Sequence, residues 1–74
     1  MTRNYPVQSQ IPASHVTDDI RWLEIHEGNN GFYLFQFTNK DMPAKWDTFY
    51  QTSDDVLDDC RNIFGVLDDM WKPK

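Results

Sequence analysis

The residues of this chain that could do chemistry are two histidines, one cysteine and a set of carboxylates. A metal ion needs three or four ligands at suitable spacing, and His15, His26 and Cys60 show no paired spacing. Cys60 falls in an apolar helical stripe, so we expect a buried, unreactive thiol. His26 lies two residues from Glu24 on one strand face, where the pair could transfer protons, but such a pair usually faces solvent. We therefore predict neither a metal site nor a catalytic site.

Motifs for catalysis and cofactor binding are missing from the sequence. It contains no glycine-rich phosphate loop and no nucleophile elbow, so we predict a non-enzymatic protein without a cofactor. Aromatic residues make up 15% of the chain and could form a platform for single-stranded nucleic acid. The net charge of −5, from twelve Asp and Glu against seven Lys and Arg, opposes binding to nucleic acid or to an anionic membrane. The same charge favours a basic protein as partner.

The acidic residues concentrate toward the end of the sequence, where the stretch VLDD occurs twice. Six aspartates share this region with one basic residue, Arg61, and they are Asp54, Asp55, Asp58, Asp59, Asp68 and Asp69. The first two can stabilise the positive end of a helix by about 0.3–1 kcal/mol each. The middle two stack at i,i+4 with other aspartates, at a like-charge cost of about 0.2–0.5 kcal/mol each. Two interpretations stay open: a solvated polar face, or an acidic recognition face that the last two extend.

A helix over residues 54–64 is needed to position these aspartates. Ser53 is a suitable N-cap, and Gly65 is a suitable C-cap. Apolar residues recur between them at helical spacing and form one stripe, which comprises Val56, Leu57, Cys60, Ile63 and Phe64. A short turn over residues 67–71 should then bring Trp71 back toward the body of the protein before Pro73.

Two β-rich runs, residues 20–27 and 32–38, flank the sequence GNNG and predict a β-hairpin. The loop length decides which side chains share a face, because a change of one residue reverses the parity of the pairing. A three-residue loop over 29–31 would place Leu23 and Ile25 with Tyr33, Phe35 and Phe37. A two- or four-residue loop would instead place them beside Phe32 and Leu34. We predict the three-residue loop because it gathers apolar groups on one side.

A third strand over residues 45–51 should pair antiparallel with the second, because the connection is short. Its phase is open: Trp46, Thr48 and Tyr50 point one way, and Asp47, Phe49 and Gln51 point the other way. With the predicted hairpin, an apolar patch would lie on the sheet face away from the helix, made of Ile20, Trp22, Phe32 and Leu34, with Trp46 and Tyr50 or Phe49. Such a patch needs a cover, which residues 1–16, a second copy or another protein could supply.

The length of 74 residues allows one domain, with an extended N-terminal arm over residues 1–16 and a β-β-β-α domain over residues 17–74. The predicted fold class is α+β: an antiparallel three-stranded meander with one amphipathic helix packed on one face. The single cysteine excludes an intramolecular disulfide, and no apolar run is long enough for a signal core or a membrane span. We therefore expect a cytoplasmic protein.

The succession from Trp46 through the helix to Phe64-Gly65-Val66 and on to Trp71 resembles a pattern found in small, mostly uncharacterised bacterial proteins. In that pattern a tryptophan-bearing strand leads into an amphipathic helix, then Phe-Gly-hydrophobic, then a tryptophan about six residues later. The resemblance covers roughly residues 20–71 and carries no catalytic residue. Some proteins of this size and acidity are immunity proteins, which block a toxin made by the same cell, so the resemblance implies a possible role of that type.

We expect a non-enzymatic domain that binds a basic protein, in the manner of an immunity-type inhibitor. The six aspartates would pair with Lys and Arg of the partner, while Trp22 and Trp46 would supply apolar anchors. The alternative is a structural or regulatory homodimer assembled through the outer face of the sheet.

Overall fold

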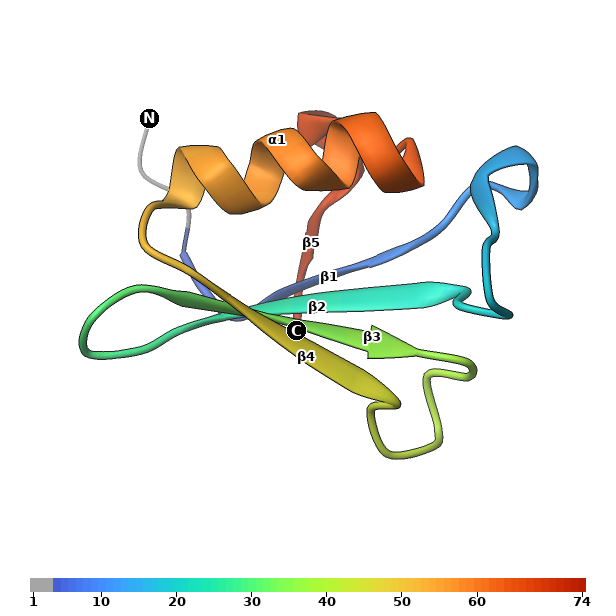
Figure 1. Cartoon of the computed structure of the whole chain (residues 1–74), viewed down its shortest axis with the longest axis horizontal. Coiled ribbons are helices and arrows are strands. Elements are labelled where there is room, and N and C mark those ends of the chain that lie inside the picture. Colours follow the sequence, from blue (N-terminus) through green and yellow to red (C-terminus); the bar gives the residue numbers. More distant parts are fainter. Residues whose placement is uncertain (1–3) are drawn as a thin grey trace.

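The computed structural model describes residues 4–74 and shows a five-stranded antiparallel sheet with a helix across one face (Figure 1). The strand order is β4-β3-β2-β1-β5. In chain order the elements are β1 (Val7–Gln10), η1 (Ala13–His15), β2 (Trp22–Glu27), β3 (Phe32–Phe37), β4 (Trp46–Tyr50), α1 (Ser53–Phe64), η2 (Asp68–Met70) and β5 (Lys72–Pro73). The α+β class and the β2-β3-β4 meander are confirmed, whereas the sheet has five strands and not three.

The two additional strands come from the two ends of the chain. β1 lies inside the segment predicted as an arm and pairs with β2 on one side, with Val7 opposite Ile25. On its other side β1 pairs with β5, with Gln8 opposite Lys72. The sequence VQSQ has one large apolar residue and follows Pro6, so its local pattern does not indicate a strand. Pairing with distant residues makes this segment a strand, and β1 lies between β2 and β5, away from both edges of the sheet.

The predicted three-residue hairpin loop is wrong. Glu27 lies opposite Phe32, and the Gly28 amide donates to the Gly31 carbonyl at 2.8 Å. The loop between the paired residues therefore contains an even number of residues. Ile25 therefore lies opposite Leu34 and shares its face, while Phe35 points to the other side of the sheet. β3 carries large apolar side chains on both faces, so its pattern alone could not decide the parity.

The core lies between α1 and the sheet face that α1 covers, which we call the inner face. Leu23, Ile25 and Leu34 of the inner face are completely buried. Val56 and Cys60 of α1 are also completely buried, as the helical stripe predicted, whereas Ile63, which the predicted stripe included, is 51% exposed. Ile20, expected on the opposite face, belongs to this core together with Val7, Ile11, Phe64, Val66 and Trp71.

The phase of β4, which the sequence left open, places Trp46, Thr48 and Tyr50 on the inner face and Asp47 and Phe49 on the outer face. This follows from the register, because Thr48 lies opposite Leu34 and Tyr50 opposite Phe32. Phe32 and Leu34, expected on the outer face, are thus inner residues.

Helix α1 begins one residue earlier than predicted. Thr52, and not Ser53, is the N-cap, and its hydroxyl accepts a hydrogen bond from the Asp55 amide at 3.1 Å. Gly65 is the C-cap, as predicted, with a φ of 66° in the left-handed region. Within residues 4–74, no helix is long and apolar enough to cross a membrane.

Candidate functional site

The six aspartates of α1 and η2, which we call the acidic layer, lie on the helix side of the molecule. Asp54, Asp55 and Asp69 are exposed and form no ion pair among the described residues. Asp54 and Asp55 stand in the first turn of α1, where a negative charge is stabilised by the helix dipole. These three carboxylates are therefore available to a cationic partner.

Arg61 joins α1 to η2. Its guanidinium donates to Asp58 at 2.7 Å and to Asp68 at 2.8 Å. These hydrogen bonds, first to Asp58 and then to Asp68, raise the pKa of Arg61 above its ordinary value. The bridge gives the one basic residue of this region a structural role, because it holds η2 against the end of the helix. It also neutralises part of the acidic layer.

Asp59 joins α1 to the sheet. The Tyr50 hydroxyl donates to the Asp59 carboxylate at 2.9 Å. Burial raises the pKa of the Tyr50 phenol, and the hydrogen bond and the charge of Asp59 raise it further. Asp59 therefore stands on the flank of α1 above β4, and Asp55, one turn earlier, lies on the same flank.

The charge of the protein is divided between its two layers. The acidic layer contains six aspartates and Arg61, whereas the other six carboxylates in the sequence are matched by six Lys and Arg residues. The acidic layer therefore carries a formal charge of −5, equal to the net charge of the sequence. The electrostatic potential is therefore most negative around the acidic layer.

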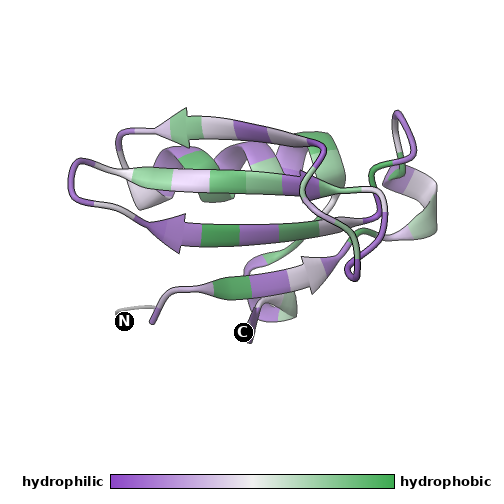
Figure 2. Ribbon diagram, turned by 90° about the horizontal axis from the view of Figure 1, so that it is seen from below, coloured by the Kyte–Doolittle hydropathy of each residue, from purple (hydrophilic) through white to green (hydrophobic). Residues whose placement is uncertain are grey.

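No helix covers the outer face of the sheet (Figure 2). The strand register places a group of aromatic side chains on this face. From the register, the group comprises Trp22, Tyr33, Phe35, Phe37 and Phe49. Tyr33 is 39% exposed and Phe49 is 46% exposed, and their ring centroids are 5.3 Å apart. An aromatic outer face is therefore present, although its members differ from those predicted, with only Trp22 and Phe49 in common.

The two tryptophans predicted as anchors do not form one surface. Trp22 is a half-buried outer residue of β2, whereas Trp46 is 44% exposed on the inner side of β4. The Trp46 ring lies under the ammonium of Lys45, with Nζ 4.6 Å from the ring centroid. One partner segment could contact the acidic layer and Trp46 together, because both lie on the inner side.

Glu24 is a buried carboxylate in the middle of the outer face. It is 6% exposed and accepts hydrogen bonds or ion pairs from two groups, His26 Nε2 at 2.9 Å and Lys74 Nζ at 3.3 Å. The edge of the His26 ring also packs on Phe35, with centroids 5.0 Å apart. The pair expected to face solvent is thus part of a packed cluster in which the Glu24 carboxylate has two partners, His26 and Lys74.

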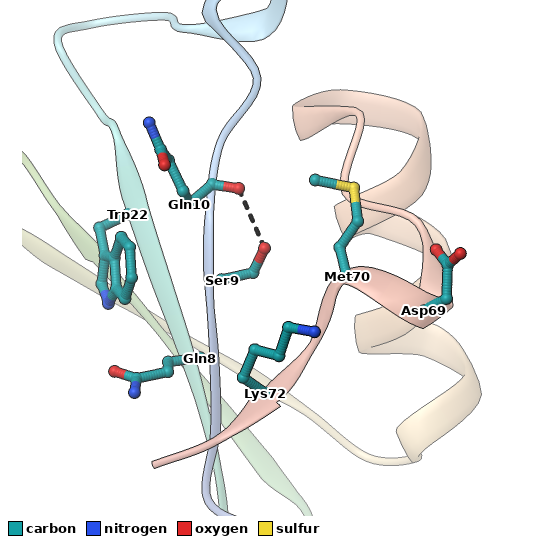
Figure 3. Close-up of a pocket in the computed structure, with 7 residues that line it drawn as sticks. All are labelled: Gln8, Ser9, Gln10, Trp22, Asp69, Met70 and Lys72. Atoms are coloured by element: carbon teal, nitrogen blue, oxygen red, sulfur yellow. Dashed lines mark hydrogen bonds between the residues drawn. The ribbon is translucent and has the colours of Figure 1, made fainter.

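A hollow of about 460 Å³ lies beside β1, where β5 ends (Figure 3). β5 pairs only with Val7 and Gln8, so the peptide groups of Gln10 lack a strand on that side. The Gln8 and Gln10 side chains extend toward Trp22, whereas Met70 and Asp69 stand on the opposite side of β1. Ser9 donates its hydroxyl proton to the Gln10 carbonyl at 2.9 Å. Trp22 and Asp69, two predicted partner-binding residues, both line the hollow, but from opposite sides of β1.

A second hollow of about 280 Å³ shares Gln10 and Trp22 with the first and is bordered by Arg21 and Lys40. The sequence did not predict that the glutamine side chains of β1 line these hollows, because the pattern of residues 1–16 gave no indication of a strand.

Among residues 4–74, no group of three His, Cys, Asp or Glu side chains is placed to hold a metal ion. Cys60 is buried, and burial raises the pKa of its thiol to about 12.

Comparisons of the chain with protein-family models, curated proteins and solved structures give no match.

Proposed function

We propose that the protein is a non-enzymatic domain that binds a basic protein through its acidic layer. The observation that carries this proposal is the concentration of charge: six aspartates and one arginine lie in α1 and η2, whereas the acidic and basic residues in the rest of the sequence are equal in number. Asp54, Asp55 and Asp69 supply unpaired carboxylates, while Asp58 and Asp59 are held in place by Arg61 and Tyr50. Complementary charge of this kind raises the association rate and selects the partner. An inhibitor of a basic toxin, as immunity proteins are, is the concrete form of this role.

Affinity capture from a lysate of the native cell tests the proposal when two charge-matched variants are compared. The first variant, Asp54→Asn/Asp55→Asn/Asp69→Asn, removes three charges from the acidic layer. The second, Asp18→Asn/Glu27→Gln/Asp41→Asn, removes three exposed charges from the rest of the molecule. We expect a basic protein to be retained by the wild type and by the second variant, and to bind the first about tenfold more weakly. Equal retention by both variants would refute a role for the acidic layer.

A homodimer assembled through the outer face is the second candidate. It is favoured by the uncovered contact between Tyr33 and Phe49, which forms an exposed aromatic surface. Sedimentation at micromolar concentration should then show a dimer that Tyr33→Glu dissociates. Ile63→Glu, at an exposed position of α1, is the matched control and should leave the dimer intact. A monomer at every accessible concentration excludes this candidate.

A further inference from the structure

The two edges of the sheet differ in their capacity to pair with another strand. The β5 edge has two residues, and one of them is Pro73, which lacks an amide proton. The β4 edge has five residues, contains no proline and keeps one constant register with β3 from Trp46 to Tyr50. In the part of the chain that the structure describes, no strand pairs with the free side of β4. The β4 edge is therefore a regular, unprotected template for strand addition.

The peptide groups of Asp47 and Phe49 point away from the sheet. The Gln36 carbonyl accepts from the Lys45 amide, so the peptide groups of β3 at positions 32, 34 and 36 face β4. Their partners in β4 are Tyr50, Thr48 and Trp46, and the alternation of an antiparallel ladder then turns positions 47 and 49 outward. Two amide donors and two carbonyl acceptors are available there.

The side chains around this edge indicate what the added strand would carry. On the inner side, Asp55 and Asp59 occupy the flank of α1 above β4, because Asp59 accepts from Tyr50. On the outer side, the edge presents the exposed ring of Phe49 beside Tyr33. A complementary strand would therefore alternate basic residues, which face the helix flank, with apolar residues, which face the aromatic rings. A second copy of this chain is the poorer fit, because its own β4 brings two acidic flanks together.

We propose that the β4 edge binds an extended basic segment of the partner protein as a sixth strand. Main-chain hydrogen bonds to Asp47 and Phe49 would supply the pairing, and Lys or Arg side chains at alternate positions would reach Asp55 and Asp59. The inference rests on the proposed function for the basic character of the partner, and adds the surface and the mode of recognition. It also gives the exposed Phe49 and the regular β4 edge a common role.

The test uses the full chain and a short peptide of alternating lysine and valine. Amide hydrogen exchange, read residue by residue by NMR, should slow by about tenfold or more at Asp47 and Phe49 when the peptide is saturating. The same peptide with N-methylated valine amides keeps its charge and loses the donors of every second residue, so it should bind poorly. This control leaves the protein unaltered. Asp55→Asn/Asp59→Asn should weaken peptide binding several-fold, whereas Asp18→Asn/Asp41→Asn should not.

The outcomes separate this inference from the proposed function. If the peptide and its N-methylated form bind equally, or if exchange at Asp47 and Phe49 is unchanged on binding, strand addition is refuted while a basic partner remains supported. If the lysine–valine peptide shows no binding dependent on the acidic layer, both proposals fail. If exchange at these two amides slows with protein concentration in the absence of peptide, a second copy occupies the edge and the inference is overturned.

Discussion

At the scale of single residues, the raised pKa values of Tyr50 and Cys60 predict that the free energy of unfolding falls at alkaline pH. Burial raises the pKa of the Cys60 thiol to about 12 from an ordinary value of 9.0, and burial with the Asp59 hydrogen bond raises the pKa of Tyr50 above 10.0. The unfolded chain therefore releases these protons before the folded protein does. The free energy of unfolding is unaffected below about pH 9 and falls above it, by at most about 1.4 kcal/mol per pH unit for each group.

Urea unfolding at neutral pH and at a series of alkaline pH values measures this decline. Tyr50→Phe should make the decline shallower above pH 10, because it removes one of the two groups. Tyr33→Phe, in an exposed position away from Asp59, serves as the control and should follow the wild type. The same slope in all three proteins would contradict the role assigned to Tyr50.

Arg61 limits how much charge the acidic layer offers. Arg61→Gln should lower the free energy of unfolding only slightly, since both ion pairs are largely exposed to solvent. The variant removes the guanidinium from Asp58 and Asp68 and makes the acidic layer more negative, so it should bind a lysine-rich peptide more tightly than the wild type and with a steeper salt dependence. Arg21→Gln makes the same change of charge on the sheet side and should alter both quantities less. Calorimetric titration at two salt concentrations compares them.

At the scale of elements, the hairpin between β2 and β3 depends on Gly31 more than on Gly28. A Cβ at Gly31 would collide with the Tyr50 carbonyl oxygen, a backbone atom of the neighbouring strand, and with the Phe49 ring. A Cβ at Gly28 would meet only the ring of Tyr33, an exposed side chain that can move. Gly31→Ala should therefore cost about 1–3 kcal/mol of stability and Gly28→Ala under about 1 kcal/mol. Equal costs in denaturant unfolding would show that the loop relaxes freely.

Strand β1 is predicted to contribute to the cooperative unit although it looks like an arm in the sequence. Val7 is buried on the inner face opposite Ile25, whereas Gln8 points outward beside Lys72. Val7→Ala should lower the free energy of unfolding by about 1–3 kcal/mol, and Gln8→Ala by under about 0.5 kcal/mol. A docked but unessential arm would instead give two small and similar values.

At the scale of the whole molecule, the layers are held by a small core, so single truncations should be severe. A domain of this length has a free energy of unfolding of about 4–11 kcal/mol. Leu34, on the inner face of β3, is fully buried, and Leu34→Ala should cost about 2–5 kcal/mol. Met42→Ala, in the exposed loop before β4, should cost almost nothing. Tryptophan fluorescence and circular dichroism should report one coincident transition in each case.

Several features of the protein could be predicted from the sequence because they depend on neighbours along the chain. The 3.6-residue spacing of Val56, Cys60 and Phe64 is enough to define α1 and its buried stripe, and Gly65 marks its end. The turn-flanked apolar runs are enough to define the β2-β3-β4 meander. The order of residues in the sequence also shows where the negative charge is concentrated, since six of the twelve acidic residues fall between positions 54 and 69.

Only the tertiary structure decided the hairpin parity, the outer face and the edges of the sheet. Phe32 and Leu34 could occupy either face by local pattern, and the close approach of Gly31 to Tyr50 accompanies the parity that buries Leu34. β1 and β5 pair as strands although the paired residues are 64 and 66 positions apart, and such a distant contact has no local signature in the sequence. The sequence by itself therefore determined the elements and the charge, whereas the pairing of distant strands determined which side chains and which edge remain open to a partner.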